Sequence, residues 1–241
     1  MSVLLEVCVD SFASVKAARA GGADRLEVCG PLATGGTTPS RGFVEYCVEA
    51  SGLPVMLMIR PHNGDFHYDD DDVAIMRRDI TIAKEIGVTG VVFGALRKDG
   101  AIDEAVCESL LNAAGDLQTT FHRAFDVTPQ PLDAFEQIQR LGFSRVLTSG
   151  QQASAIDGSA LLRELVKRSS KTRVLAGAGI GASNVRRLVE ETGLSEVHAS
   201  ASRAVTDAKP TDNAVSFGEG RRVTDPDLVR SLKAELARIC H

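Results

Sequence analysis

Five polar residues lie in short segments of the sequence that are otherwise apolar. They are Glu6, Glu27, Arg60, His122 and His198. An imidazole titrates near neutral pH, a neighbouring carboxylate can exchange protons with it, and a guanidinium can hold an anion. Because side chains alternate along a strand, the sequence predicts that these five residues point to one side of a sheet and surround one cavity. Such a set suits acid–base catalysis on a small anionic molecule.

Two cysteines form a second candidate site. Cys8 and Cys29 each end the sequence Leu-Glu-Val-Cys, which occurs at residues 5–8 and again at residues 26–29. Thiols on adjacent strands, about 4.8 Å apart, could meet at one ion, and thiolates favour Cu(I) or zinc over magnesium or calcium. The spacing is not that of a C-x-x-C motif, however, and a buried cysteine commonly serves as a small hydrophobic residue. The spacing alone leaves both interpretations open.

A third group of residues could bind phosphate or another anion. Gly177 and Gly179 follow one predicted strand, Ser200 and Arg203 follow the next, and Arg123 follows an earlier one. In many barrels the loops after the last two strands bind phosphate through backbone N–H groups. An arginine adds a charge-assisted hydrogen bond. The alternative is that the glycines serve only to make tight turns.

The two glutamates also have a structural interpretation. A charge inside a protein is costly unless it is paired, so Glu6 and Glu27 could belong to ion pairs that fill the centre of the fold and orient its strands. The convergence of five polar residues favours a pocket over this packing role.

The elements that must position these residues alternate along the chain. Short apolar segments predict eight strands, at residues 4–9, 25–29, 54–60, 90–94, 118–122, 145–147, 173–176 and 196–200. Segments of helical period predict helices near residues 12–21, 40–51, 69–86, 103–114, 130–141, 155–169, 183–192 and 225–239. Eight such units predict an α/β fold of the (β/α)8 TIM barrel type, with residues 1–241 in a single domain. The polar residues then fall toward the carboxyl ends of the strands, where barrels of this type carry their active sites.

Two further segments bear on the fold. Residues 177–182 read G-x-G-x-x-A between a strand and a helix, as in a dinucleotide-binding fold. That motif comes too late in the chain to leave room for a second mononucleotide half, so we reject this alternative. Residues 202–222 are polar and rich in Asp, Thr and Gly, which predicts a long loop at the carboxyl-terminal mouth of the barrel.

The composition excludes several classes of protein. The 241 residues carry 27 Lys+Arg against 32 Asp+Glu, and this net charge of −5 argues against a nucleic-acid-binding protein. The longest uncharged apolar run, residues 86–96, is too short to cross a membrane. Five cysteines, an odd number, and an N-terminus without a basic leader predict a cytoplasmic protein with reduced thiols.

Eight sequence blocks, in order, resemble the CutC copper-homeostasis family. They are Glu6-Val7-Cys8-Val9-Asp10-Ser11, Gly22-Ala23-Asp24-Arg25-Leu26-Glu27-Val28-Cys29, Gly35-Gly36-Thr37-Thr38-Pro39-Ser40, Met58-Ile59-Arg60-Pro61, Gly64-Asp65-Phe66, Val92-Phe93-Gly94, Thr120-Phe121-His122-Arg123-Ala124-Phe125-Asp126 and Leu147-Thr148-Ser149-Gly150. The resemblance implies a cytoplasmic TIM barrel, usually a homo-oligomer, linked to copper tolerance. The two cysteines suggested as Cu(I) ligands in the family fall on Cys8 and Cys29.

This chain departs from the family's pattern at two places. His62 and Asn63 stand where the family commonly has Arg-Gly, which lowers the positive charge near Arg60. Ala178 interrupts a turn that the family makes from three glycines.

Three hypotheses of function follow. The first is a copper-homeostasis protein that binds a Cu(I) ion through Cys8 and Cys29. The alternative is a TIM-barrel enzyme that acts on a small anionic or phosphorylated substrate at the barrel mouth. The third is a barrel without catalytic activity that serves as an oligomeric scaffold.

Overall fold

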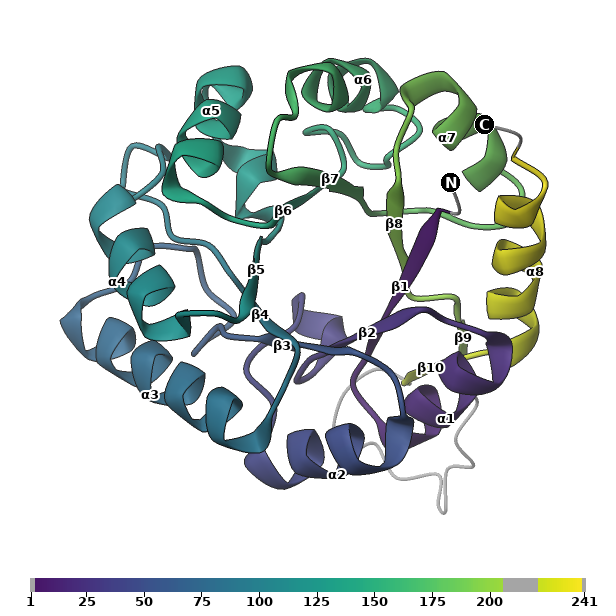
Figure 1. The fold of residues 1–241 in the computed structure, drawn as a ribbon, viewed down its shortest axis with the longest axis horizontal. Coiled ribbons are helices and arrows are strands. Elements are labelled where there is room, and N and C mark those ends of the chain that lie inside the picture. Colours follow the sequence, from purple (N-terminus) through teal and green to yellow (C-terminus); the bar gives the residue numbers. More distant parts are fainter. Residues whose placement is uncertain (1–2, 206–220, 240–241) are drawn as a thin grey trace, which may run out of the picture.

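Eight parallel strands form a closed barrel in the computed structural model, which describes residues 3–205 and 221–239. Each strand pairs with the next in the sequence, and the first pairs with the eighth (Figure 1). The strands are β1 (Leu4–Val9), β2 (Arg25–Val28), β3 (Val55–Met58), β4 (Gly90–Phe93), β5 (Gln118–Phe121), β6 (Arg145–Thr148), β7 (Arg173–Ala176) and β8 (Glu196–Ala199). This architecture confirms the predicted (β/α)8 TIM barrel.

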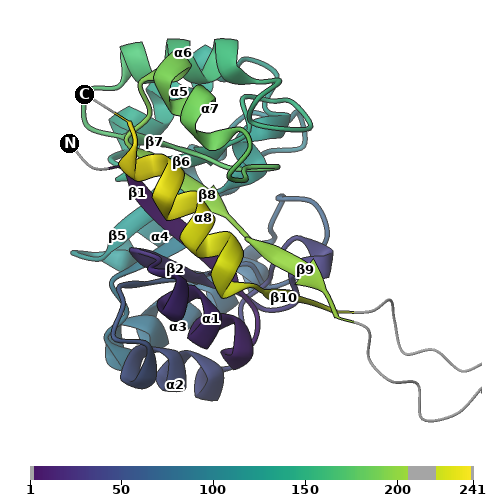
Figure 2. The ribbon, with the colours of Figure 1, turned by 90° about the vertical axis from the view of Figure 1, so that its right-hand side faces the viewer.

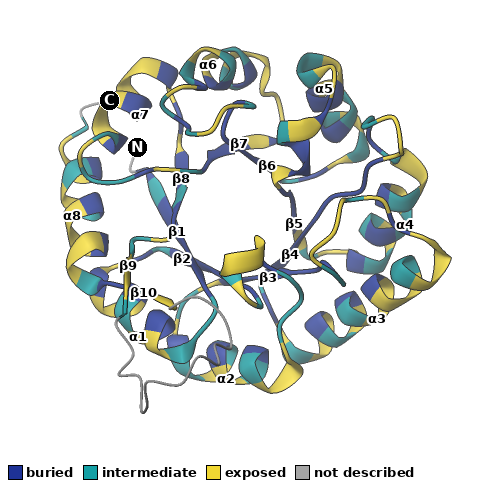
Figure 3. Cartoon of the chain, turned by 180° about the vertical axis from the view of Figure 1, so that it is seen from behind, coloured by how far each residue is buried: buried dark blue, intermediate teal, exposed yellow. Residues whose placement is uncertain are grey.

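Helices of the described residues surround the barrel, and two short 3-10 helices follow β2 and β5. The α-helices are α1 (Phe12–Gly21), α2 (Arg41–Ser51), α3 (Asp70–Ile86), α4 (Glu104–Ala114), α5 (Pro131–Leu141), α6 (Ser159–Arg168), α7 (Val185–Thr192) and α8 (Pro226–Ala237), and the 3-10 helices are η1 (Leu32–Thr34) and η2 (Arg123–Val127). Figure 3 shows buried residues on the helix faces that meet the barrel and exposed residues on the outer faces. The main hydrophobic core therefore lies between the strands and the ring of helices.

Helix α6 begins four residues later than the sequence predicts. The segment just before it is held away from helical geometry, because the backbone N–H of Ala155 donates to the carbonyl of Ala178 in the loop after β7, at 3.0 Å. The other boundaries lie close to the predicted ones. Asp103 caps the first turn of α4, and Gly87 ends α3 in the left-handed conformation, with a φ of 83°.

Buried ion pairs fill the amino-terminal part of the barrel interior. Glu196 accepts hydrogen bonds from Arg25 and Arg145, both at 2.7 Å, and from Arg173 at 3.0 Å. Arg25 also donates to Glu6 at 2.5 Å. We call these five residues the barrel floor. The ion-paired packing considered from the sequence is therefore present at this level of the barrel.

The predicted loop 202–222 needs a correction, because both of its ends are strands. β9 (Ser202–Ala204) pairs in antiparallel fashion with β10 (Arg222–Thr224), and the Arg222 side chain donates to the carbonyl of Ser202 at 2.6 Å. Figure 2 shows this two-stranded sheet extending from the barrel beside α1 and α8. Residues 206–220 of the predicted loop lie outside the described residues.

None of the helices in the described ranges combines the length and the apolar character of a membrane-spanning helix.

Glu196→Gln tests the barrel floor. The amide keeps the size of the side chain but removes the charge that the buried guanidiniums of Arg25 and Arg145 share, so we expect the free energy of unfolding to fall by about 3–5 kcal/mol. Urea denaturation measures this loss. The matched control is Glu190→Gln on α7, where the carboxylate is exposed and lies 3.7 Å from Arg186, with an expected change within about 0.5 kcal/mol. Equal, small losses in both variants would contradict a structural role for the Glu196 charge.

Candidate functional site

A cavity of about 370 Å³ lies above the barrel floor, toward the carboxyl ends of the strands. Side chains of β1, β2, β3, β6 and β8 and of the segments after β2, β3 and β5 form its wall. Six of the residues predicted from the sequence line it, namely Cys8, Glu27, Arg60, His122, Arg123 and His198. The polar residues of strands far apart in the sequence thus meet in one pocket.

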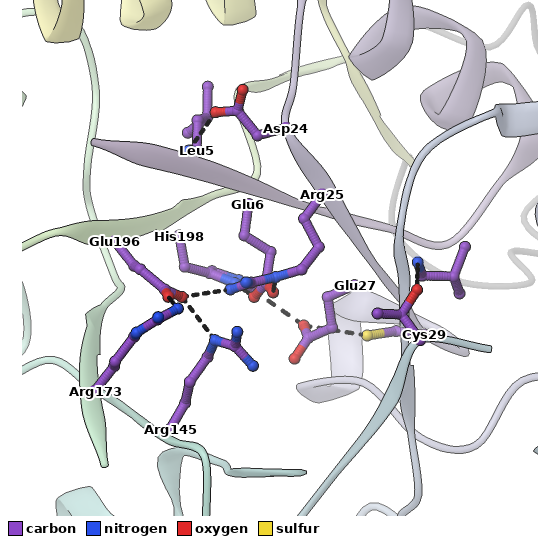
Figure 4. A network of polar contacts seen from close by, with 12 residues as sticks. Leu5, Glu6, Asp24, Arg25, Glu27, Cys29, Arg145, Arg173, Glu196 and His198 are labelled. Carbon is purple, nitrogen blue, oxygen red and sulfur yellow. Dashed lines mark hydrogen bonds and ion pairs between the residues drawn. The ribbon is translucent and has the colours of Figure 1, made fainter. Parts of the chain in front are cut away.

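Glu6 joins the barrel floor to the pocket. Its second carboxylate oxygen, Oε1, lies 2.8 Å from Nδ1 of His198, as the cluster in Figure 4 shows. Burial alone would raise the pKa of Glu6, but His198 and Arg25 outweigh burial and lower it to about 2. Glu6 is therefore an anion that orients His198 and does not itself line the cavity.

Cys8, Glu27 and His198 form a compact group of possible metal ligands. One ligand atom from each lies within 4.8 Å of the others, and His198 Nε2 is 3.9 Å from Glu27 Oε2. Burial opposes a charge on His198, yet Cys8, Glu27 and Glu6 around it hold its pKa well above the ordinary value of 6.5. Burial raises the pKa of Glu27. This group offers one soft, one borderline and one hard donor atom.

Cys29 lies beside this group without belonging to it. Its Sγ contacts Glu27 Oε2 at 3.4 Å, and its side chain packs in an interior cluster with Met56, Met58 and Val92. Burial and the Glu27 carboxylate raise the pKa of the Cys29 thiol well above 9.0. Glu27 thus stands between the two cysteines predicted as partners.

Arg60 is a buried cation that lines the same pocket and follows β3. It donates to the carbonyls of Thr34 and Gly36 at 3.3 and 3.0 Å and to that of Gly64 at 2.7 Å. Gly35 and Gly36 have φ angles of 85° and 82°, a backbone conformation that glycine adopts readily and that shapes this loop against the guanidinium. The Nε of Arg60 has no hydrogen-bond partner among the described residues.

His122 is a neutral, buried imidazole next to Arg60. Its Nδ1 accepts the N–H of Ala124 at 3.3 Å, which leaves the proton on Nε2, and Nε2 has no partner among the described residues. Burial first, and the charge of Arg60 second, lower the pKa of His122 to about 3. At neutral pH this side chain is a hydrogen-bond donor without a charge, so it does not act there as a cation.

Arg123 also lines the pocket, but its charge is already paired. Its Nε donates to Asp126 at 2.8 Å and its Nη2 to Ser149 at 3.1 Å. Asp126 in turn accepts the hydroxyls of Thr148 and Ser149. Arg123 thus fixes the segment after β5 against the end of β6.

The predicted phosphate-binding residues after β7 and β8 do not line this pocket, although Gly177 packs against two residues that do, Leu147 and His198. Gly177, Gly179, Ser200 and Arg203 are not among the residues that line the pocket. Arg203 is 71% exposed and forms an ion pair with Asp225 at 3.0 Å. Ala178, which interrupts the family's glycine turn, has a left-handed φ of 81°, which is strained for a residue with a Cβ.

Five apolar residues of the pocket wall were not predicted as site residues, namely Leu32, Met58, Phe66, Val127 and Leu147. Met58 ends β3 two positions before Arg60, so the period of the strand contained the signal. Phe66 lies 4.8 Å from the His122 ring and beneath Arg60, whose guanidinium carbon is 5.0 Å from the ring centre. Phe66 lies in a loop, where no strand period indicates which side chains point into the pocket.

The neutrality of His122 predicts a pH-dependent stability. Between the ordinary histidine pKa of 6.5 and the folded value of about 3, only the unfolded chain binds the proton. Stability from this group is therefore complete above about pH 6.5 and falls by about 1.4 kcal/mol per unit as the pH drops toward 3. We expect urea denaturation between pH 6 and pH 4.5 to show that slope in the difference between wild type and His122→Gln. A difference that stays constant with pH would mean that His122 is charged in the folded protein.

Comparisons with known proteins identify the family. The model of the CutC family matches residues 3–203. A CutC family protein of Pasteurella multocida is 47% identical over 197 residues, which are 81% of each chain. The human copper homeostasis protein cutC homolog is 43% identical over 241 residues, covering 96% of this chain and 88% of the human one.

A solved structure agrees with these relatives. The crystal structure of a CutC protein from Streptococcus agalactiae superimposes with a TM-score of 0.78 at 32% identity, covering 82% of this chain and 98% of that one. The barrel, the two Leu-Glu-Val-Cys strands and the pocket residues all fall within the part of the chain that the family model matches. The chain belongs to the CutC family.

Proposed function

We propose that this protein serves copper homeostasis by binding a Cu(I) ion at Cys8. The grouping of Cys8, Glu27 and His198 at the base of the pocket is the observation that carries the proposal. A human and a mouse relative, each 43% identical to this chain, are named copper homeostasis proteins. That name supports the choice of copper over other soft metals.

The donor set fits Cu(I) better than it fits a hard cation. Thiolate and imidazole are ligands that Cu(I) accepts, whereas magnesium and calcium require several oxygens. Cys8 and His198 supply the sulfur and the nitrogen, and Cys29 supplies a second thiol behind Glu27. The thioether of Met58 adds a soft atom to the same pocket wall. We expect Cys8 to be the principal ligand because it faces both the cavity and the imidazole.

We also propose that the protein acts in the cytoplasm and assembles as a homo-oligomer. Cys8, Cys29, Cys47 and Cys107 are free thiols in the described part of the chain, and reduced thiols that bind Cu(I) suit a reducing compartment. Cys240 lies outside the described residues. Assembly with further copies of the chain rests on the family resemblance.

A second candidate function is an enzyme that acts on a small anionic substrate. The pocket lies where TIM barrels carry their active sites, and buried polar atoms of three lining residues, Glu27, Arg60 and His122, have no partner among the described residues. In this interpretation His198 and Glu27 are the acid–base pair and Arg60 holds the substrate. A metal ion bound by Cys8, Glu27 and His198 would not account for the unpartnered atoms of Arg60 and His122.

An anaerobic competition titration with a chromophoric Cu(I) chelator tests the copper proposal. We expect tight one-to-one binding by the reduced wild type and an affinity at least ten times lower for Cys8→Ser, a difference of about 1.4 kcal/mol. Loss of the sulfur removes the softest donor of the group, and the double variant Cys8→Ser, Cys29→Ser should lose tight binding altogether.

The control for this titration is Cys47→Ser. That thiol is buried on α2, away from the pocket, and its replacement should leave the Cu(I) affinity unchanged. Circular dichroism of each variant verifies that the barrel is intact. Wild-type affinity in the double variant would refute both cysteines as ligands, while loss in Cys47→Ser as well would show that copper binds to exposed thiols of unfolded protein.

A further inference from the structure

We propose that the pocket contains a second binding site, for the carboxylate of a small organic acid, formed by Arg60 and His122. The inference deepens the second candidate function, because it names the class of ligand, and it does not depend on copper. It rests on three observations about the described residues: the hydrogen bonds that Arg60 leaves unused, the missing partner of His122 Nε2 and the absence of an anion paired with Arg60.

Arg60 has two N–H groups left over after its protein contacts. A guanidinium carries five N–H groups. Two on Nη1 go to the carbonyls of Thr34 and Gly36, and one on Nη2 goes to Gly64. The remaining donors are the N–H of Nε, which has no partner among the described residues, and one N–H of Nη2. The phenol of Tyr68 lies close to the guanidinium and is a neutral acceptor. An N–H on Nε and an N–H on Nη2 can bind the two oxygens of one carboxylate.

The charge of Arg60 lacks a counter-ion in the described part of the chain. Only 6% of the residue is exposed, yet its hydrogen-bond partners are neutral carbonyls and its ring contact is Phe66. Tyr68 lies near it, but burial raises the pKa of the phenol, which stays neutral. A buried cation is costly unless an anion compensates it. A ligand that enters the pocket can supply that anion.

His122 adds a third donor on the same side of the pocket. Its Nε2–H is fixed by the hydrogen bond that Nδ1 accepts from Ala124 and is unpartnered. Gly94 leaves room for the ring, since a Cβ at that position would lie 2.8 Å from His122 Nδ1. The Arg60 side of the pocket therefore presents unused donors, an arrangement that selects an anion over a neutral or cationic group.

A carboxylate fits this arrangement better than a phosphate. Phosphate sites in barrels use several backbone N–H groups and a helix N-terminus, and the loops that could provide them, around Gly177 and Ser200, do not line the cavity. Glu27, which lines the same cavity, has one unpartnered carboxylate oxygen. A hydroxyl group on the ligand could donate to it. The structure thus assigns the pocket to a small hydroxy acid.

Saturation-transfer NMR titrations with named probes test this assignment. The probes are lactate, glycerate and malate as hydroxy acids, lactamide as the neutral analogue, and inorganic phosphate and glycerol phosphate as phosphates. We expect the hydroxy acids to bind, the amide to show no binding, and the phosphates to bind at least tenfold more weakly. Binding of the amide equal to that of lactate, or a preference for the phosphates, would overturn the proposal, as would the absence of binding by every hydroxy acid.

Variants locate the bound carboxylate. Arg60→Lys keeps the charge but loses the paired donors, and we expect at least tenfold weaker binding of the hydroxy acids. His122→Leu removes the third donor with Arg60 intact and keeps the test available if Arg60→Lys does not fold. Arg97→Lys is the matched control, because that arginine is exposed and paired with Asp99. Loss of binding in Arg203→Gln, with wild-type binding in Arg60→Lys, would place the anion at the outer loop and refute the site.

The same samples separate this inference from the two proposed functions. Proton NMR of the wild type incubated with each bound acid reports chemical change. A bound, unchanged acid supports the site and argues against an enzyme for these acids, whereas conversion supports both. The Cu(I) titration of Arg60→Lys should match that of wild type, so failure of copper binding and failure of carboxylate binding are scored independently.

Discussion

Glu6 lies near the middle of the barrel and accepts hydrogen bonds from two sides, from Arg25 in the floor and from His198 in the pocket. A carboxylate buried this completely is stable only as long as cations satisfy it. Arg25 is held in turn by Glu196. The orientation of His198, and with it the position of its second nitrogen toward Cys8 and Glu27, therefore depends on ion pairs that reach to the opposite end of the barrel.

The pocket is chemically divided as a result. On the side of β1, β2 and β8, the charge of His198 is compensated by Glu6 and Glu27, and the thiol of Cys8 completes the group. On the side of β3 and β5, the charge of Arg60 is not compensated by any described residue. The first side can exchange a proton for a soft metal ion without leaving a bare charge, and the second favours an incoming anion. Two kinds of ligand can therefore use one cavity, with Glu27 as the residue that both would contact.

The sequence predicted the barrel and the members of the pocket but not their pairings. Alternation of apolar and polar residues identifies inward side chains, and glycine and aspartate at helix ends identify where elements stop. The residue that contacts Cys8 cannot be found from such local patterns. His198 follows Cys8 by 190 positions and becomes its neighbour only because β8 pairs with β1 when the barrel closes. Cys29 follows the end of β2 and contacts Glu27, the residue opposite Cys8 in the β1–β2 register. Strand spacing alone left the pairing of the two thiols open, and the closed register brings the imidazole to Cys8.

Burial does not distinguish the structural polar residues of this barrel from those of its pocket. Glu196 and Glu27 are 2% and 3% exposed, and both point into the interior. They differ in the satisfaction of their oxygens: Glu196 accepts from three arginines, whereas Glu27 keeps an oxygen without a partner. Arg25 and Arg60 differ in the same way. The floor is not paired completely, because Nη1 of Arg145 has no partner among the described residues. Its carboxylates are nevertheless satisfied by arginines, whereas the unpartnered groups of Glu27, Arg60 and His122 belong to residues that line a cavity, where a ligand can supply what the chain does not.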